Sequence, residues 1–324
     1  MGIRPNPRVV VIVPCLNEES TVGGVIDAFR LALPDAEVFV IDNGSDDGTA
    51  AVADRHGATV LRESRRGKGN AVRRAFREID ADIYVLVDGD ATYPAERVRD
   101  VIAPVLDDRA DVVVGARLDA DSRSEFRTVN RFGNRLLLRV VNTVFAAHIT
   151  DLLSGYRVMT REFVRQVPVL SVGFEVETEL SILALERGFR TVEVPIRLAS
   201  RPEGSRSKIR IWRDGFRILN AILTLFRDYR PLTFFGTLGV LSMLTGLAPG
   251  IAVTIEFVER GTVRIPTAVL ATGLEIVGFT FALTGIVLGA LSRRFRELDC
   301  RLDRIQSATE PSGGLANDGR DRSS

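Results

Sequence analysis

Histidine is scarce in this sequence: His56 and His148 are the only two among 324 residues. This scarcity disfavours a hydrolase that depends on a catalytic histidine, and it disfavours a metal site built from several histidines. The two cysteines, Cys15 and Cys300, lie far apart and match no zinc or redox spacing. We therefore expect reduced cysteines, as in a protein that faces the cytosol.

An excess of either charge is missing as well. Lys and Arg number 43 and Asp and Glu 42, so the formal net charge of +1 gives no reason to expect a nucleic-acid partner. The first apolar run is short and meets Pro14 at once, so we expect a strand there and not a signal peptide. With 45% hydrophobic residues, the composition is that of a folded chain, and its length suits one catalytic domain plus an appendage.

Short apolar runs alternate with amphipathic stretches up to about residue 200. The runs are β-branched and apolar on both faces, as buried parallel strands are, and they cover residues 9–13, 38–41, 83–87 and 112–114. Helical patterns lie between them, over residues 21–33, 48–56, 67–79 and 94–106. This alternation predicts an α/β domain with a mainly parallel sheet sandwiched by helices, whose ligands bind beyond the carboxyl ends of the strands.

Two long stretches near the C-terminus carry almost no charge. Residues 234–255 carry none, and residues 265–291 carry only Glu275. Each stretch is long enough to cross the hydrocarbon core of a bilayer, which predicts a transmembrane helical hairpin over residues 232–292. Glu275 is costly there unless it is paired or faces the neighbouring helix. It could mark a helix–helix contact or a contact between copies in a homo-oligomer, or it could simply be hydrated near a membrane boundary.

The segments that flank the hairpin are basic. Residues 208–231 combine apolar residues at helical spacing with lysines and arginines, which predicts an amphipathic helix at the membrane interface. Arginines cluster on both outer sides of the hairpin, whereas the connecting loop balances its arginines with glutamates. The positive-inside rule therefore predicts a two-span membrane protein whose catalytic domain, residues 1–207, faces the cytoplasm. The remaining residues, 293–324, read as a disordered cytosolic tail.

The letters DGD follow one of the apolar runs and place Asp88 and Asp90 on either side of Gly89. Two hard carboxylates at this spacing suit Mg²⁺ or Mn²⁺, and a metal ion there can neutralise a leaving diphosphate. A second pair, Asp119 and Asp121, lies several residues beyond its run among polar residues, and we interpret it as a solvated loop. The position at the end of a buried strand thus favours the first pair as the metal ligands.

Two other segments carry groups that suit a nucleotide. Asp42 ends its predicted strand, where its carboxylate could accept hydrogen bonds from a base or ribose, or act as a turn former. Lys68 begins a predicted helix between two glycines, where backbone N–H groups and the lysine could meet phosphate. The spacing is not that of a P-loop, and no GxGxxG follows the first predicted strand, which disfavours a dinucleotide-binding fold.

Taken in order, the segments PCLNEES, VIDNGSDDGT, RGKGNAVR, VDGD, GAR and DLLSGYRV resemble family 2 glycosyltransferases with the GT-A fold. The resemblance covers residues 8 to about 230 and is closest to the dolichyl- or polyprenyl-phosphate hexose synthase branch, which the C-terminal hairpin also suits. It implies an inverting enzyme that moves a hexose from a UDP- or GDP-sugar to a polyprenyl or dolichyl phosphate, with Mg²⁺ or Mn²⁺ as cofactor.

The resemblance also implies roles at matching positions. Asp88 and Asp90 would bind the metal, although members often carry Gln where this chain has Thr92. The donor would contact a wider set, comprising Pro14, Asn17, Glu18, Asp42, Lys68, Asp88, Arg201 and Lys208. On the acceptor side, the set that grips phosphate comprises Arg117, Arg131 and Asn134, and Asp151 of DLLSGYR matches a carboxylate near the attacking oxygen. Whether Asp151 acts as a base or orients another group stays open.

An acceptor phosphate is already a nucleophilic anion near neutral pH, so the reaction requires arginine forks more than a strong base. The alternating glutamates of FEVETEL, Glu175, Glu177 and Glu179, could lie partly on the catalytic face, but we prefer dipole compensation at a helix start. Three alternatives remain: a polysaccharide-forming transferase, for which two spans look too few; a tethered transferase with a soluble acceptor; and a scaffold without activity, against which the intact Asp88–Asp90 pair argues.

Overall fold

The computed structural model describes residues 6–117, 138–139, 141–143, 147–173, 175–198, 223–224, 226–227 and 230–309. The chain divides into two compact units, one over residues 1–225 and the other over residues 226–324. The predicted interface helix over 208–231 falls almost entirely outside the described residues, and so do Asp119 and Asp121. Both interpretations therefore stay predictions.

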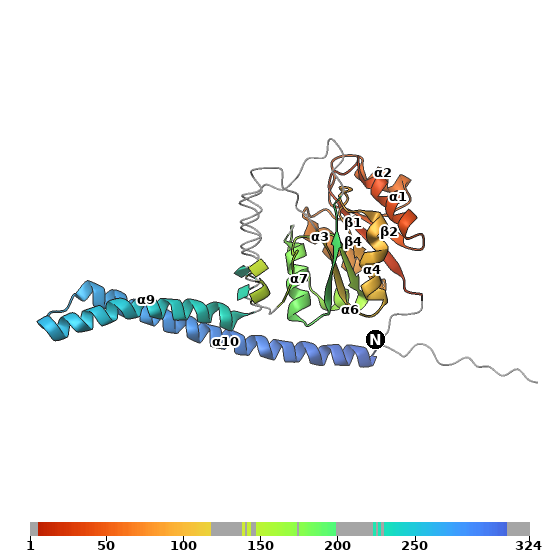
Figure 1. Cartoon of the computed structure of the whole chain (residues 1–324). Coiled ribbons are helices and arrows are strands. Elements are labelled where there is room, and N and C mark those ends of the chain that lie inside the picture. The colour runs from red at the N-terminus through yellow and green to blue at the C-terminus, as the bar shows by residue number, and fades with distance from the viewer. Residues whose placement is uncertain are drawn as a thin grey trace, which may run out of the picture. The chain divides into compact units, whose positions relative to one another are not determined.

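A seven-stranded sheet forms the centre of the first unit (Figure 1). Its strands are β1 (Val9–Cys15), β2 (Glu37–Asp42), β3 (Thr59–Arg62), β4 (Ile83–Leu86), β5 (Val112–Arg117), β6 (Arg157–Thr160) and β7 (Thr191–Ile196). The strand order is β3-β2-β1-β4-β6-β5-β7. All neighbouring strands pair in parallel except β6, which is antiparallel to both β4 and β5. The prediction of a mainly parallel sheet in an α/β fold is confirmed.

Helices cover both faces of this sheet. On one face, α1 (Val22–Ala32), α2 (Thr49–Arg55) and α4 (Val98–Leu106) share a hydrophobic core with alternate residues of the central strands. On the other face lie α3 (Lys68–Glu78) and α7 (Val176–Glu186), as Figure 1 shows. A short 3₁₀ turn, η1 (Ala95–Arg97), precedes α4, and α6 (Arg161–Gln166) follows β6. Helices are present at all four positions predicted from the periodicity. The first three begin and end within one or two residues of the predicted bounds, whereas the fourth, α4, begins at Val98 because residues 95–97 form the 3₁₀ turn.

No apolar run in the sequence predicts β3, β6 or β7. β3 is only four residues long and lies at the sheet edge, where its side chains are half-buried or exposed. β6 begins with Arg157, an arginine with no exposed surface, so the letters RVMT did not read as a buried strand. β7 contains Glu193 and Pro195, which edge strands tolerate but which break an apolar run.

The second unit is a pair of long helices, α9 (Pro231–Arg260) and α10 (Ile265–Thr309), which lie side by side in Figure 1. Both are long and apolar enough to cross a membrane, and only 11% of each apolar window is buried. Glycines allow the two backbones to approach closely, because a Cβ on Gly239 would lie 2.7 Å from the Gly278 carbonyl oxygen. Ser242 Oγ also donates to the Leu274 carbonyl at 2.8 Å. These helices indicate membrane association.

Two details of this hairpin bear on the sequence analysis. Glu275 is half-buried, and its Oε1 would lie 3.3 Å from a Cβ on Gly246, so the side chain faces α9. The predicted contact between copies through these helices stays a prediction. The expectation of a disordered tail from residue 293 is wrong for residues 293–309, because α10 continues to Thr309. This stretch has no glycine or proline and is rich in Arg, which favours helix.

Candidate active site

The loops after β1 and β2 are joined by hydrogen bonds at the carboxyl edge of the sheet. Asn17, which has a positive φ of 53°, accepts from the Asp46 N–H at 2.8 Å through Oδ1. The Glu18 N–H donates to Thr49 Oγ1 at 2.9 Å. Asp42 is only 7% exposed and accepts from the Ser45 N–H at 3.1 Å. Asp42 therefore acts as a turn former, and its carboxylate also lies at the edge where a nucleotide was predicted.

The DGD segment follows β4 at the same edge. A Cβ on Gly89 would lie 2.6 Å from the sulfur of Cys15, so only glycine fits between the two loops. Thr21 Oγ1 donates to the Gly89 carbonyl at 2.7 Å, which fixes the backbone between the two aspartates. Asp90 accepts from Thr92 Oγ1 at 2.6 Å through Oδ1, so Thr92 orients a predicted metal ligand from the position where family members often have Gln.

The donor set at Asp88 and Asp90 fits a divalent cation. Both side chains are partly exposed, and their oxygens are the hard ligands that Mg²⁺ and Mn²⁺ prefer. The Lys68 ammonium rests against Asp88 Oδ1, so this carboxylate already has a cation beside it. Among the described residues no group of three or more His, Cys, Asp or Glu side chains converges.

Lys68 lies between two carboxylates and points into the protein. Its Nζ contacts Asp88 Oδ1 and lies 2.5 Å from Oε1 of Glu177, a residue in the first turn of α7. Burial alone would lower the pKa of Lys68, but the two carboxylates outweigh burial and raise it, so the lysine is charged. Burial raises the pKa of Glu177 more than the Lys68 ammonium lowers it. The preferred explanation of Glu177 as simple dipole compensation is therefore incomplete.

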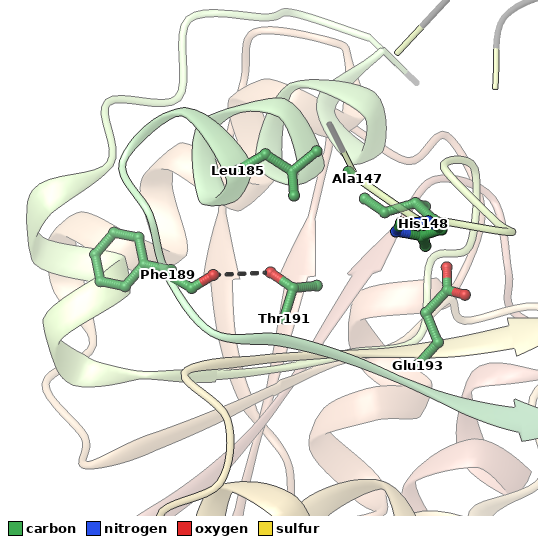
Figure 2. A pocket seen from close by; sticks show the side chains of 7 residues that line it. Ala147, His148, Leu185, Phe189, Thr191 and Glu193 are labelled. Carbon is green, nitrogen blue, oxygen red and sulfur yellow. Dashed lines mark hydrogen bonds between the residues drawn. The ribbon is translucent and has the colours of Figure 1, made fainter. Parts of the chain in front are cut away.

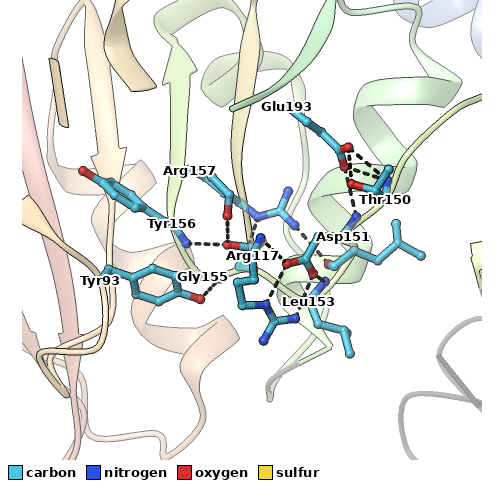
Figure 3. A network of polar contacts seen from close by, with 12 residues as sticks. Tyr93, Arg117, Thr150, Asp151, Leu153, Gly155, Tyr156, Arg157 and Glu193 are labelled. Carbon is cyan, nitrogen blue, oxygen red and sulfur yellow. Dashed lines mark hydrogen bonds and ion pairs between the residues drawn. The ribbon is translucent and has the colours of Figure 1, made fainter. Parts of the chain in front are cut away.

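Arg117, the last residue of β5, forms a two-pronged ion pair with Asp151 (Figure 3). Its Nε donates to Oδ2 at 2.7 Å and its Nη2 to Oδ1 at 2.8 Å. The backbone N–H groups of Arg117 and Leu153 also donate to the carboxylate, at 3.1 and 3.0 Å. Burial would raise the pKa of Asp151, but Arg117 and these N–H groups hold it below its usual range.

Glu193 of β7 anchors the segment that carries Asp151. Its carboxylate accepts from the backbone N–H groups of Thr150 at 2.9 Å and Asp151 at 3.0 Å, and from the Thr150 hydroxyl at 2.6 Å (Figure 3). Arg157 supports the same segment from beneath the surface, because its guanidinium donates to the Leu152 and Ser154 carbonyls at 3.1 and 3.0 Å. Neither Glu193 nor Arg157 was predicted as a site residue from the sequence.

The segment from Asp151 to Gly155 connects the two groups of charged residues. At one end, Asp151 holds Arg117. At the other end, a Cβ on Gly155 would lie only 2.5 Å from Asp88 Oδ2, and the Gly155 N–H donates to Tyr93 Oη at 2.8 Å. Five consecutive residues thus bring the predicted phosphate-binding arginine and the predicted metal pair to the same place on the sheet edge.

A cavity of about 250 Å³ adjoins Glu193, the residue that anchors this segment (Figure 2). It is lined by Ala147, His148, Ile149, Leu185, Phe189, Thr191 and Glu193. None of the predicted site residues lines it, and Glu193 is the lining residue that also anchors Asp151. The cavity is therefore adjacent to the Arg117–Asp151 pair and separate from the edge that carries Asp88 and Asp90.

Four predicted site residues lie outside the described residues: Arg131, Asn134, Arg201 and Lys208. The other predicted residues all belong to the first unit. Pro14, Asn17, Glu18 and Asp42 lie in or beside the joined loops after β1 and β2, and Lys68, Asp88 and Asp90 lie around the DGD segment. The structure thus brings donor-side residues together at one edge.

Comparison with known proteins decides the family. A model described as glycosyl transferase family 2 matches residues 10–167. Glycosyltransferase AglJ of Haloferax volcanii is 34% identical over 305 residues, which cover 93% of this chain and 100% of that protein. The chain belongs to glycosyltransferase family 2. A second H. volcanii member, a dolichyl-phosphate hexose transferase, is 32% identical over 221 residues, covering 68% of this chain and 94% of that protein.

Solved structures show the same fold. Glucosyl-3-phosphoglycerate synthase from Mycobacterium tuberculosis aligns with a TM-score of 0.58 at 23% identity, over 68% of this chain and 80% of that one. That enzyme was crystallised with Mn²⁺, UDP-glucose and phosphoglyceric acid, and in another crystal with Mg²⁺ and UDP. The predicted GT-A fold is confirmed, and this family 2 chain is a glycosyltransferase. The crystals of this neighbour with Mn²⁺ or Mg²⁺ support use of a divalent metal with this fold.

Proposed function

We propose that this glycosyltransferase moves a hexose from a nucleotide sugar to the phosphate of a polyprenyl or dolichyl lipid, with inversion at the sugar carbon. The arrangement that carries the proposal is the Asp151–Gly155 segment, which holds Arg117 at one end and lies so close to Asp88 at the other that a Cβ on Gly155 would meet that carboxylate. The acceptor phosphate on Arg117 and the donor diphosphate at the Asp88–Asp90 pair would then lie close together, because only the five residues of this segment separate their binding groups. The dolichyl-phosphate hexose transferase among the relatives and the apolar hairpin support a lipid as the phosphate carrier.

The donor is proposed to bind at the loops after β1, β2 and β4. Asp42, with Pro14, Asn17 and Glu18 beside it, would take the nucleoside, because buried acceptors at this edge suit ribose and base donors. Asp88 and Asp90 would hold Mg²⁺ or Mn²⁺, which supplies positive charge for the departing diphosphate. Arg201 and Lys208 are expected to add cations on the donor side, and UDP- and GDP-sugars both remain candidates.

On the acceptor side, Arg117 would bind the phosphate and Asp151 would orient Arg117. Both Asp151 oxygens accept hydrogen bonds from Arg117, and the lowered pKa of the carboxylate makes it a poor proton acceptor. A phosphate acceptor requires no base, because it is already anionic. Within the described residues only Nε and Nη2 of the Arg117 side chain form hydrogen bonds, so Nη1 is the atom proposed to reach the phosphate. Arg131 and Asn134 would complete this phosphate site.

The hairpin would anchor the enzyme in the bilayer with its catalytic domain on the cytoplasmic side, where nucleotide sugars are made. A second candidate function keeps the same chemistry but uses a soluble phosphorylated acceptor. The fold neighbour crystallised with phosphoglyceric acid favours that candidate, since Arg117 could bind either phosphate. The hairpin would then serve only as a tether.

The test is an acceptor and donor panel with the full-length enzyme in detergent. UDP-glucose, a UDP-N-acetylhexosamine and GDP-mannose are each incubated with Mn²⁺ and either a polyprenyl phosphate or 3-phosphoglycerate, and products are read by mass. We expect a glycosylated lipid phosphate with one donor. Product from 3-phosphoglycerate alone would refute the lipid assignment and favour the second candidate.

The same assay tests the phosphate-binding role of Arg117. Arg117→Lys replaces the planar guanidinium by an ammonium group, which cannot bind phosphate through two parallel N–H groups. The KM for polyprenyl phosphate should rise by about tenfold or more, and the KM for the donor should stay within about twofold of wild type. Arg109→Lys is the matched control, because Arg109 forms an exposed pair with Asp107 before the opposite end of β5. A change in the donor KM alone would contradict the assignment.

A further inference from the structure

Lys68 and Glu177 form a buried pair behind the predicted metal ligand Asp88. The exposed fractions of their side chains are 7% and 5%. The two residues are 109 positions apart in sequence, one at the start of α3 and the other in the first turn of α7. Burying an ion pair costs solvation energy, so two helices meeting on such a pair call for an explanation beyond stability.

The neighbouring glutamates of the same segment have local partners. Glu175 accepts from the Gly173 N–H at 3.0 Å, and Glu179 accepts from the Leu170 and Ser171 N–H groups at 2.9 Å each. These two residues fix the loop before α7. Glu177 instead reaches Lys68, at 2.5 Å, and through it Asp88. Glu177 therefore differs in its contacts from Glu175 and Glu179, even though the spacing of the three in sequence is regular.

We propose that Glu177 is a positioning residue of the donor site, which acts through Lys68 on Asp88. Glu177 holds the Lys68 ammonium in a fixed place, and the ammonium holds Asp88 Oδ1. Asp88 is thereby kept in one orientation beside Asp90. Lys68 becomes part of the support of the metal ligands, in place of the direct phosphate contact expected from its sequence context. The inference rests on the proposed metal-assisted donor site.

The physical reason lies in competition for Asp88. With Glu177 present, the Lys68 ammonium is shared between two carboxylates, and its attraction to Asp88 is balanced by the attraction to Glu177. Without the Glu177 charge, this balance would shift toward Asp88, and the lysine would compete with a metal ion for the Asp88 carboxylate. Partners behind metal ligands commonly change metal affinity by about 10- to 100-fold when they are replaced.

The experiment measures Mn²⁺ binding to the full-length enzyme without turnover, by the electron paramagnetic resonance signal of free Mn²⁺. Glu177→Gln keeps the shape of the side chain and should weaken Mn²⁺ binding by about tenfold or more. Glu177→Asp keeps the charge but shortens the side chain. Its affinity for Mn²⁺ should fall between those of wild type and Glu177→Gln. Glu179→Gln is the matched control on the same helix; it should lower the thermal stability and leave Mn²⁺ affinity within about twofold.

A double-mutant cycle identifies the route through Lys68. In a Lys68→Met background, Glu177→Gln should cause little further change in Mn²⁺ affinity, since the ammonium that transmits its effect is absent. In turnover, Glu177→Gln should raise the Mn²⁺ concentration for half-maximal rate, and saturating Mn²⁺ should restore most of kcat. A loss of kcat at every Mn²⁺ concentration, or an equal loss of affinity in both backgrounds, would overturn the inference.

The outcome is separable from that of the proposed function. If wild-type enzyme fails to glycosylate any polyprenyl phosphate but Glu177→Gln still weakens Mn²⁺ binding, the acceptor assignment fails and the role of Glu177 stands. If wild-type enzyme makes the lipid product and Glu177→Gln binds Mn²⁺ like wild type, the role of Glu177 fails and the function stands.

Discussion

Asp151→Asn tests whether Asp151 orients Arg117 or serves as a base. The carboxylate accepts four hydrogen bonds: from Nε, Nη2 and the backbone N–H of Arg117, and from the Leu153 N–H. Asparagine keeps one acceptor oxygen, but it removes the charge and turns an N–H₂ group toward one of these donors. The Asp151 side chain is 7% exposed, whereas 28% of the Arg117 side chain is exposed, so solvent screens part of the pair.

From these contacts we expect Asp151→Asn to lower the free energy of unfolding of the catalytic unit by about 2 kcal/mol. For a unit of this size such a loss lowers Tm by about 4 to 8 °C. The assay is thermal unfolding of the full-length protein in detergent. Asp107→Asn is the control, because its pair with Arg109 is exposed on both sides and should change stability by less than about 1 kcal/mol.

The pH dependence has a definite sign. Arg117 and the backbone N–H groups hold the pKa of Asp151 below its usual range, so the stabilisation is present at pH values above the unfolded pKa, about 4, and is lost as pH falls through the lower folded pKa. The Tm difference between wild type and Asp151→Asn should be complete at pH 7 and shrink as the pH falls below about 4. A constant difference across this range would mean that the charge of Asp151 is not what stabilises the pair.

Kinetics separate the two roles of Asp151. If Asp151 orients Arg117, Asp151→Asn raises the KM for polyprenyl phosphate and keeps the acid limb of the pH–rate profile. A base role would instead remove that limb and lower kcat at an unchanged acceptor KM. The second result would refute the reasoning from the two-pronged pair.

Two further substitutions test the donor side. Asp90→Asn should lower turnover by about 100-fold or more at any Mn²⁺ concentration, with Tm nearly unchanged. Asp119→Asn is the control and should leave turnover unchanged. Equal effects of the two substitutions on the rate would exclude the metal role of Asp90. Gly155→Ala places a Cβ 2.5 Å from Asp88 Oδ2 and must displace that carboxylate, so we expect a turnover about tenfold lower. Gly24→Ala is its control, since a Cβ there meets open space in α1, and wild-type turnover in both variants would show that Asp88 tolerates displacement.

The central strands were predictable because burial on both faces leaves a continuous apolar run. Continuous apolar runs mark β1, β2, β4 and β5 in the sequence. In a parallel sheet the carboxyl ends of such strands must lie at one edge. That rule is enough to place Asp42 and Asp88 at one edge from the order of the apolar runs. It says nothing about β6, whose first residue is a buried arginine held by carbonyl groups and Ser181 rather than by an apolar surrounding.

Glu177 shows why part of the candidate site could not be predicted from the sequence. Within FEVETEL, three acidic residues at alternate positions near a helix start satisfy the helix dipole equally well. The difference between them lies in their partners, and the partner of Glu177 is 109 residues away in sequence. No local pattern reports such a contact. A lysine between two glycines reads equally well as a phosphate contact or as a buried cation.

The antiparallel direction of β6 is what assembles the site. β6 lies between β4 and β5, and Arg157, its first residue, pairs with Leu86 at the end of β4 and with Val114 in β5. Because β6 runs against its neighbours, the chain enters it at the edge where β4 and β5 end. A parallel strand in this position would begin at the opposite edge and would carry residues 151–155 away from the DGD segment. Reversal of one strand thus brings Asp151 to Arg117 and Gly155 to Asp88.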